Sequence, residues 1–290
     1  MDTPGRRRAE SLPRPRLLAC DIDGTLLDHA GALRVEVREA IGMIRASGVH
    51  VVLATGRSPW TGVGPIATEL GLSGPQITMQ GALISDVHTG AVAQLRVLTP
   101  DVYAHALRFA RHHGLEPIVS VIDGHRAGRG AERDAWGQPP VESETFRLVP
   151  DLAMVAEEQP MRVYLPIEPH RFRTLLEEAI AWAGDGASVV WSDGIGLEFL
   201  APGTHKGAAV AWLAAQHDLT LDDVAAVGDQ ANDREMLSMA GRSAAMGGAP
   251  ADIAACADIL VPPSSESGVL DAFAWFFPDL APVLLDAPAA

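Results

Sequence analysis

Cysteine is scarce in this 290-residue sequence, which contains only Cys20 and Cys256, so neither a disulfide framework nor a thiolate zinc site can be argued. Apolar tracts of about 18 residues, the length needed to span a membrane, are also missing, and no signal-sequence pattern opens the chain. The sequence has no heptad pattern and no internal repeat. These absences leave a cytoplasmic globular protein without a membrane partner as the expectation, and both cysteines are expected to be small core residues.

Positive charge is also in short supply. Lys and Arg number 22 against 37 Asp and Glu, which gives a formal net charge of −15 at pH 7. A nucleic-acid-binding surface needs a basic face, so this balance argues against a nucleic-acid partner. The same charge repels anionic substrates at long range, and a phosphate site would need local positive charge from a bound cation, from Lys or Arg, or from helix N-termini.

Short apolar runs are present, and three of them end in polar residues suited to phosphate chemistry. Residues 17–20 run into Asp21-Ile22-Asp23-Gly24-Thr25, residues 51–54 into Thr55-Gly56-Arg57, and residues 224–227 into Gly228-Asp229-Gln230-Ala231-Asn232-Asp233. If the runs are parallel strands, these polar groups collect at one edge of one sheet, where open α/β sheets bind ligands. Because helical patterns alternate with the runs, we expect an α/β fold with a doubly wound parallel sheet.

The alternation changes character in the middle of the chain. We expect a flexible tail over residues 1–16, a core domain made of 17–85 and 195–290, and an inserted α+β domain over 86–194. Apolar periodicity predicts helices over 33–47, 59–70, 100–113, 169–182, 204–216 and 232–240, and strands over 49–54, 77–79, 82–84, 91–97, 116–121, 161–165, 187–191, 196–200, 224–227 and 258–261. A Gly- and Pro-rich loop is expected over 124–140.

The first of the three motifs carries the most chemistry. Asp21 directly follows a predicted strand, and a carboxylate held there is a feasible nucleophile towards phosphorus. Asp23 could protonate the leaving oxygen and later activate water. Gly24 permits the tight turn, and Thr25 offers a hydroxyl to the phosphate. The alternative is a helix N-cap or a surface turn, because Asp-Gly is a common turn dipeptide.

The second motif and a lysine could supply the phosphate contacts. Thr55 and the backbone at Gly56 could donate hydrogen bonds to a phosphate oxygen, and Arg57 could clamp the phosphate, although a helix cap and a surface charge are the alternatives. Lys206 falls in the first turn of a predicted helix, where the dipole favours anions. A nearby anion would explain the lysine, and a solvated side chain is the alternative.

The third motif predicts a metal site. Asp229 follows a strand end as Asp21 does, and Asp233 lies in the first turn of the next predicted helix. Carboxylate oxygens of this kind suit Mg²⁺, which takes one or two protein carboxylates together with a substrate phosphate. An acidic first turn of a helix, which is common, is the alternative.

Taken together, the motifs resemble those of the haloacid dehalogenase (HAD) superfamily, specifically its Cof-like branch of phosphohydrolases. Four motifs occur in the family's order: Asp21-Ile22-Asp23-Gly24-Thr25-Leu26, Thr55-Gly56-Arg57, Lys206, and Gly228-Asp229 with Asn232-Asp233. The resemblance implies a Rossmann-like HAD core with an inserted α/β cap that closes over the sheet edge. One departure is that Gln80-Gly81-Ala82 stands where the family often has Asn-Gly-Ala.

The resemblance also assigns roles. Asp21 would be the nucleophile, Asp23 the general acid and base, and Thr55 and Lys206 the residues that hold the phosphoryl group. The substrate-binding set would be Thr25, Gly56, Arg57 and Asn232. Mg²⁺ would be bound by the Asp21 carboxylate, the Asp23 backbone carbonyl and Asp229, with Asp233 supporting the metal.

The function that follows is a Mg²⁺-dependent phosphatase that hydrolyses a small phosphorylated metabolite through an aspartyl-phosphate. A phosphohexomutase of the same superfamily is one alternative, and its bisphosphate would need cations from the inserted domain, whose arginines include Arg108, Arg111, Arg126, Arg129 and Arg133. The other alternative is a non-catalytic protein that binds a phosphorylated metabolite. The sequence says nothing about oligomeric state.

Overall fold

The computed structural model describes residues 13–28, 30–129, 141–192 and 196–285. The chain divides into two compact units, Met1–Val92 with Lys206–Ala290, and Ala93–His205. Most of the predicted tail, residues 1–12, lies outside the described residues. Within the described part of the chain, no helix has both the length and the apolar composition needed to cross a membrane.

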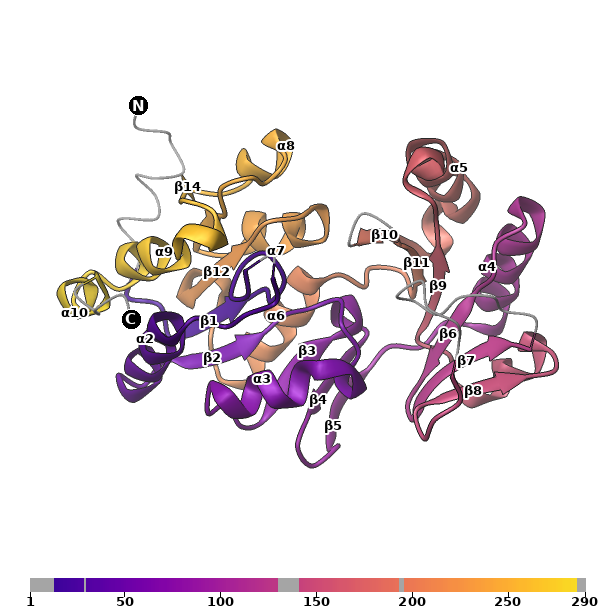
Figure 1. Ribbon diagram of the computed structural model, residues 1–290, viewed down its shortest axis with the longest axis horizontal. Coiled ribbons are helices and arrows are strands. Elements are labelled where there is room, and N and C mark those ends of the chain that lie inside the picture. The colour runs from indigo at the N-terminus through magenta and orange to yellow at the C-terminus, as the bar shows by residue number, and fades with distance from the viewer. Residues whose placement is uncertain (1–12, 29, 130–140, 193–195, 286–290) are drawn as a thin grey trace. The chain divides into compact units, whose positions relative to one another are not determined.

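A five-stranded parallel sheet forms the centre of the first unit (Figure 1), with the strand order β14-β13-β12-β1-β2. Its strands are β1 (Leu17–Cys20), β2 (His50–Leu53), β12 (Val224–Gly228), β13 (Arg242–Ala245) and β14 (Ile259–Leu260). Cys20, the last residue of β1, pairs with Val227 on one side and with Leu53 on the other. The carboxyl ends of these three neighbouring strands, β12, β1 and β2, are therefore level, and the residues that follow them share one edge of the sheet.

Helices cover both faces of this sheet. Leu18 and Cys20 point into a core shared with α2 (Val35–Ala46), α3 (Gly64–Glu69) and α9 (Val269–Phe276). Leu17 and Ala19 point the other way, into a core shared with α6 (Lys206–Gln216), α7 (Arg234–Met239) and α8 (Ala251–Ala254). Because β1 is covered on both sides, its residues are all apolar, which is the pattern of a parallel strand. The predicted doubly wound α/β fold is confirmed.

An antiparallel hairpin continues the first unit beyond β2. Its strands are β3 (Pro75–Thr78) and β4 (Leu83–Asp86), and an isolated parallel bridge joins Ile77 of β3 to Ala54, just after β2. A third strand, β5 (Val92–Leu95), completes a three-stranded sheet. The connection between β3 and β4, Met79–Gly81, is a short tight turn whose three residues all have positive φ values.

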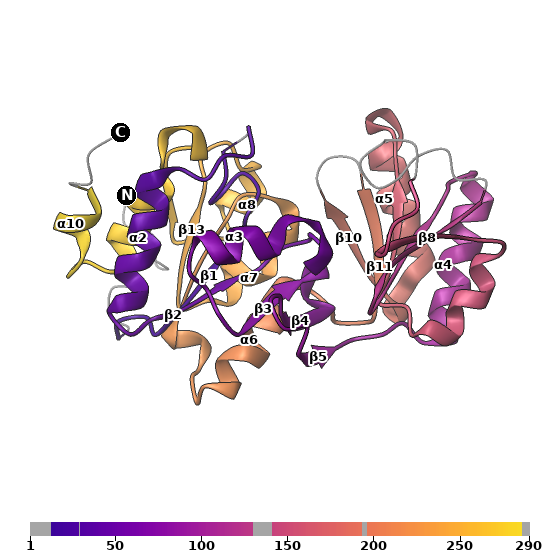
Figure 2. The ribbon, with the colours of Figure 1, turned by 60° about the horizontal axis from the view of Figure 1, so that its bottom comes forward.

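The second unit is built on a six-stranded sheet with helices on one face (Figure 2). The helices that cover it are α4 (Pro100–His113) and α5 (Phe172–Ala183). The strand order is β10-β11-β9-β6-β7-β8, made of β6 (Ile118–Val121), β7 (Gly124–Gly128), β8 (Phe146–Val149), β9 (Arg162–Pro166), β10 (Ser188–Ser192) and β11 (Gly196–Leu200). Pairing is antiparallel except between β7 and β8.

The structure corrects several predicted elements. The loop expected over 124–140 begins with strand β7, whose polar Gly-His-Arg-Ala-Gly sequence lacks an apolar pattern and is held as a strand by its pairing with β6 and β8. The single helix expected over 59–70 is a turn of π-helix, Pro59–Val63, followed by α3. Strands β8 and β13 and helices α8, α9 and α10 (Ala281–Leu285) were not predicted.

The boundaries between the units also differ from the expected ones. The units divide at 92/93 and 205/206, whereas the sequence placed the divisions at 85/86 and 194/195. The second division moves because β11 pairs with β9 and β10 and so belongs to the sheet of the second unit.

Candidate active site

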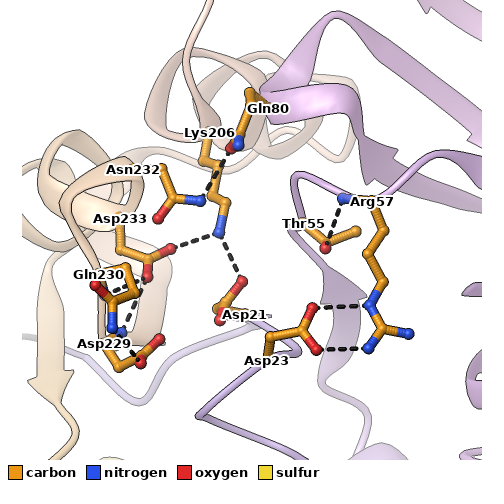
Figure 3. Close-up of polar contacts among 10 residues, drawn as sticks. All are labelled: Asp21, Asp23, Thr55, Arg57, Gln80, Lys206, Asp229, Gln230, Asn232 and Asp233. Carbon is orange, nitrogen blue, oxygen red and sulfur yellow. Dashed lines mark hydrogen bonds and ion pairs between the residues drawn. The ribbon is translucent and has the colours of Figure 1, made fainter. Parts of the chain in front are cut away.

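A buried ion-pair network lies at the carboxyl edge of the first unit's sheet (Figure 3). Asp21 follows β1 directly, and its backbone N–H donates to the Val227 carbonyl of β12 at 3.0 Å, so the strand holds the residue in place. The Nζ of Lys206, at the first residue of α6, donates to Asp21 Oδ1 at 2.6 Å and to Asp233 Oδ1 at 2.7 Å. Lys206 and Asp233 are fully buried, and Asp21 is 5% exposed.

Burial and neighbouring charges have opposing effects on the pKa values of Lys206 and Asp21. Burial lowers the pKa of Lys206, but the carboxylates of Asp21 and Asp233 outweigh that effect and hold the pKa above its ordinary value, so the amine stays charged. Burial raises the pKa of Asp21 well above its ordinary range; Lys206 lowers it, while Asp233 and Asp229 raise it further. Lys206, the only lysine in the sequence, is therefore a permanent cation among more carboxylates than it can neutralise.

Asp233 organises the loop that follows β12. Its Oδ2 accepts the backbone N–H groups of Asp229 at 2.9 Å and Gln230 at 3.1 Å, while Oδ1 is occupied by Lys206. The Gln230 side chain donates to Asp229 Oδ2 at 3.1 Å. The other oxygen of Asp229, Oδ1, is buried and has no hydrogen-bond partner among the described residues. Burial, followed by the charge of Asp233, raises the pKa of Asp229 to about 6.

These carboxylates fit a divalent cation. One oxygen from each of Asp21, Asp229 and Asp233 lies within 4.8 Å of the others, and all three residues are buried. Three carboxylates against one ammonium leave two negative charges uncompensated when all are ionised, which a divalent cation would balance. The unpartnered Asp229 Oδ1 is a ready ligand atom. The site is therefore compatible with a bound metal ion.

Two glycines make room for the acidic cluster. A Cβ atom at Gly24 would lie 2.4 Å from Asp229 Oδ2, and one at Gly228 would lie 2.4 Å from the carboxyl carbon of Asp233. Gly24 also has a φ of +74°, a conformation that side chains disfavour. Both glycines are thus required by the close approach of the backbone to these carboxylates.

Asp23 lies apart from the buried cluster and pairs with the second motif. Its side chain is 46% exposed, and the Arg57 guanidinium forms a bidentate ion pair with it, Nε donating to Oδ2 at 2.7 Å and Nη2 to Oδ1. The buried Thr55 hydroxyl accepts from the Arg57 backbone N–H at 3.0 Å and so shapes the same loop. The structure brings Asp23 and Arg57 together as partners, a contact that the sequence did not predict.

The remaining predicted residues leave polar atoms unsatisfied at the same edge. Thr25 Oγ1 and Asn232 Oδ1 are buried without a hydrogen-bond partner in the described part of the chain. Asn232 Nδ2 donates to Gln80 Oε1 at 3.2 Å. Sequence analysis identified Gln80 only as a departure from a family pattern and assigned no role to Gln230. Both residues lie near the site because of the turns that contain them, and the sequence pattern does not predict the geometry of those turns.

Arg126 and Arg108 of the second unit have local partners. Arg126 pairs with Asp123 and Glu158, and Arg108 donates to His105 Nδ1. Arg133 lies outside the described residues. No arginine cluster specific to a bisphosphate is therefore evident in the described part of this unit.

Comparison with known proteins identifies the family of the chain. Residues 18–273 match the haloacid dehalogenase-like hydrolase family, and the chain belongs to that family. The predicted resemblance is thereby confirmed, and the protein is a phosphatase, a phosphoric monoester hydrolase, as predicted.

Two relatives match over nearly their full length. The chain is 28% identical over 261 residues to pyridoxal phosphate phosphatase YbhA of Escherichia coli, covering 85% of this chain and 93% of that protein. It is 27% identical over 279 residues to phosphatase YwpJ of Bacillus subtilis, covering 88% and 97%. Among solved structures, a haloacid dehalogenase-like hydrolase from B. subtilis has a TM-score of 0.75 at 23% identity, covering 90% of this chain and 98% of the other. That solved structure therefore shares the fold of this chain.

Proposed function

We propose that the protein is a Mg²⁺-dependent phosphatase that hydrolyses a small phosphorylated metabolite through an aspartyl-phosphate on Asp21. The observation that carries the proposal is the buried contact of Lys206 Nζ with both Asp21 and Asp233 at the end of β1, beside Asp229. The strand β1 holds the nucleophile, Asp21, in a fixed position. The Lys206 ammonium lies beside it, where the negative charge of the carboxylates would otherwise repel a phosphate. Positioning and electrostatic stabilisation of this kind dominate phosphoryl transfer.

The reaction proceeds in two displacements. In the first, a carboxylate oxygen of Asp21 forms a bond to phosphorus, the bond from phosphorus to the leaving oxygen breaks, and Asp23 donates its proton to that oxygen. In the second, water attacks phosphorus, Asp23 accepts the water's proton, and Asp21 is released with inorganic phosphate. Lys206 stays protonated and offsets the phosphoryl charge in both steps.

Arg57 has two roles in this scheme. In the structure its guanidinium occupies both oxygens of the Asp23 carboxylate through a bidentate ion pair. Asp23 can exchange a proton with the leaving oxygen or with water only when one of these oxygens is accessible, so the guanidinium has to leave that carboxylate. We propose that the substrate phosphate draws Arg57 away and is clamped by it, joined by the hydroxyls of Thr25 and Thr55, the backbone at Gly56 and the Asn232 amide.

The metal-binding residues are proposed from the acidic cluster. Asp21 and Asp229 would hold Mg²⁺, together with the Asp23 backbone carbonyl that the family resemblance implies. When bound, the ion would offset negative charge on the phosphoryl group. Both oxygens of Asp233 already accept hydrogen bonds, from Lys206 and from two backbone N–H groups, so its role is to fix Lys206 and the loop that carries Asp229.

The names of the relatives support a substrate class. YbhA is named a pyridoxal phosphate phosphatase, and a B. subtilis relative, 26% identical over 257 residues, is named a 5-amino-6-(5-phospho-D-ribitylamino)uracil phosphatase. We therefore propose a phosphomonoester of a small metabolite and place pyridoxal phosphate, sugar phosphates and polyol phosphates first in a substrate panel. A cytoplasmic location and the absence of nucleic-acid and membrane partners stay predictions.

The test measures phosphate release across this panel with and without Mg²⁺, for the wild type and Asp21→Asn. We expect Mg²⁺-dependent release by the wild type, loss of turnover of about 10³-fold or more in the variant, and acid-stable labelling of the wild type alone by a ³²P-phosphomonoester. Asp271→Asn, an exposed position in the first turn of α9, is the matched control and should retain wild-type rates. Wild-type turnover by Asp21→Asn contradicts the proposal, and bisphosphate-stimulated sugar isomerisation would replace it with the mutase.

A further inference from the structure

The connection between β3 and β4 adopts a strained backbone beside the active site. Met79, Gln80 and Gly81 have successive φ values of +51°, +58° and +94°. Only glycine adopts this region freely, so Met79 and Gln80 are held there against the preference of their backbones. Asn tolerates this conformation better than most residues, but the chain has Gln at position 80. A residue kept against its backbone preference points to a use for its side chain.

Backbone hydrogen bonds attach this turn to the second motif. The Met79 N–H donates to the Arg57 carbonyl at 3.0 Å, and the Gln80 N–H donates to the Thr55 carbonyl at 3.1 Å. The turn therefore cannot relax without disturbing the loop that contains Thr55 and Arg57, so the strain persists because its surroundings fix it.

The Gln80 side chain reaches from this loop to the loop after β12. It is 1% exposed, and its Oε1 accepts from Asn232 Nδ2 at 3.2 Å (Figure 3). Its Nε2 lies so close to Gly56 that a Cβ there would be 2.3 Å away. Strands β2 and β12 flank β1 on either side. The amide of Gln80 thus links the two loops that border the strand carrying Asp21.

We infer that Gln80 is a positioning residue, whose side-chain amide fixes the orientation of the Asn232 amide and the spacing of the Thr55–Arg57 and Asp229–Asp233 loops around the phosphoryl site. The inference rests on the proposed function, because it concerns the same phosphate-binding groups. Asn at position 80 would suit the backbone better but is one methylene shorter, so it would not span the distance to Asn232. The longer side chain explains why Gln occupies a strained position.

Gln80→Asn separates the side-chain role from the backbone role. We expect this variant to unfold at the wild-type temperature or slightly above, because the backbone strain is relieved, while kcat/KM falls about 10- to 100-fold through misplacement of Asn232. In an Asn232→Ala background the same substitution should cause no further loss, since Gln80 acts through Asn232. Unchanged kcat/KM in Gln80→Asn, or an equal loss in both backgrounds, overturns the inference.

Two glutamines serve as matched controls. Gln76 is a buried glutamine of β3 that accepts from the Leu53 N–H at 2.9 Å, so Gln76→Asn should lower stability and leave kcat/KM unchanged. Gln159 has a φ of +57° on the surface of the second unit, so Gln159→Asn should reproduce the backbone effect alone.

A binding measurement distinguishes failure of this inference from failure of the proposed function. Calorimetric titration of inorganic phosphate in the presence of Mg²⁺ needs no turnover, and we expect about tenfold weaker binding to Gln80→Asn than to the wild type. If Asp21→Asn retains turnover but Gln80→Asn still weakens phosphate binding, the mechanism is wrong and the positioning role stands. Equal phosphate affinity in the wild type and Gln80→Asn overturns the positioning role itself.

Discussion

Replacing Lys206 with Met tests the central electrostatic argument. Met has similar length and apolar volume, so the substitution removes the ammonium and leaves little cavity. Two hydrogen bonds of 2.6 and 2.7 Å to Asp21 and Asp233 are lost at a fully buried position. Breaking a buried ion pair costs roughly 3–5 kcal/mol because the remaining charge is uncompensated. We expect a loss near this size without Mg²⁺, measured by urea unfolding at pH 7.

Lys206→Met should change Mg²⁺ binding and catalysis in opposite directions. Without the ammonium, the acidic cluster holds three uncompensated carboxylates instead of two, so Mg²⁺ should bind Lys206→Met more tightly and restore more stability than it gives the wild type. Activity should nevertheless fall, by about 10² to 10³-fold in kcat, because a fixed cation at the phosphoryl group is missing. The assays are urea unfolding with and without MgCl₂ and phosphate release at saturating substrate.

The control is a surface ion pair of the same unit. Arg38 and Glu69 lie 3.8 Å apart with side chains 43% and 47% exposed, so Arg38→Met should change stability by less than about 1 kcal/mol and leave the rate unchanged. If Lys206→Met is no less stable than Arg38→Met and keeps a rate within tenfold of wild type, the reasoning from the buried network is refuted.

Three further changes have outcomes fixed by the geometry. Asp229→Asn should weaken Mg²⁺ binding at least tenfold, measured by calorimetry. It should also stabilise the metal-free protein by roughly 2–3 kcal/mol at pH 7, because the raised pKa of about 6 means that the ionised Asp229 side chain opposes folding. A metal-free variant less stable than the wild type would contradict this. Gly24→Ala should displace Asp229, since its Cβ would lie 2.4 Å from Oδ2, and both stability and Mg²⁺ affinity should drop; wild-type affinity would show that the glycine is dispensable. Burial, followed by the charges of Arg162 and Arg126, lowers the pKa of His125 to about 3. The unfolded state therefore binds more protons than the folded state below pH 6.5, and the free energy of unfolding should fall by about 1.4 kcal/mol per pH unit from there towards pH 3. Acid unfolding of the wild type and of His125→Gln, which should lose this pH dependence, measures the effect.

The sequence predicted that residues of the candidate site meet at one edge of the sheet, because they follow rigid, recognisable strands. Asp21, Thr55 and Asp229 each come just after a buried apolar run, and the register of β1 with its two neighbours places them at one edge. Helix α4 was predicted with its observed bounds because its ends carry local signals: Thr99 accepts from the Val102 N–H, Pro100 begins the helix, and Gly114 ends it at a φ of +63°.

Elements that depend on tertiary pairing were not predictable in this way. Strand β7 has no apolar alternation, and Gly124 at its start is required because a Cβ there would lie 2.3 Å from the Thr145 carbonyl oxygen, a contact distant in sequence. The Asp23–Arg57 ion pair and the Gln80–Asn232 hydrogen bond likewise join residues 34 and 152 positions apart. The spacing of residues along the chain does not predict such contacts. The types of the candidate site residues could therefore be predicted, but their hydrogen-bond and ion-pair partners could not.

Because Lys206 is the single lysine of the sequence, proteolysis at this residue can report local unfolding of the first unit. Because the sequence contains no other lysine and this one is fully buried, a lysine-specific protease has one cleavage point, after residue 206, and reaches it only when the first unit opens. Cleavage yields two fragments, 1–206 and 207–290, without competing cuts. When opening and closing are fast compared with cleavage, the rate of fragment formation gives the opening free energy directly. A ligand that closes the acidic cluster around Lys206 would thus be detected on a gel as slower proteolysis, whether or not it is ever turned over.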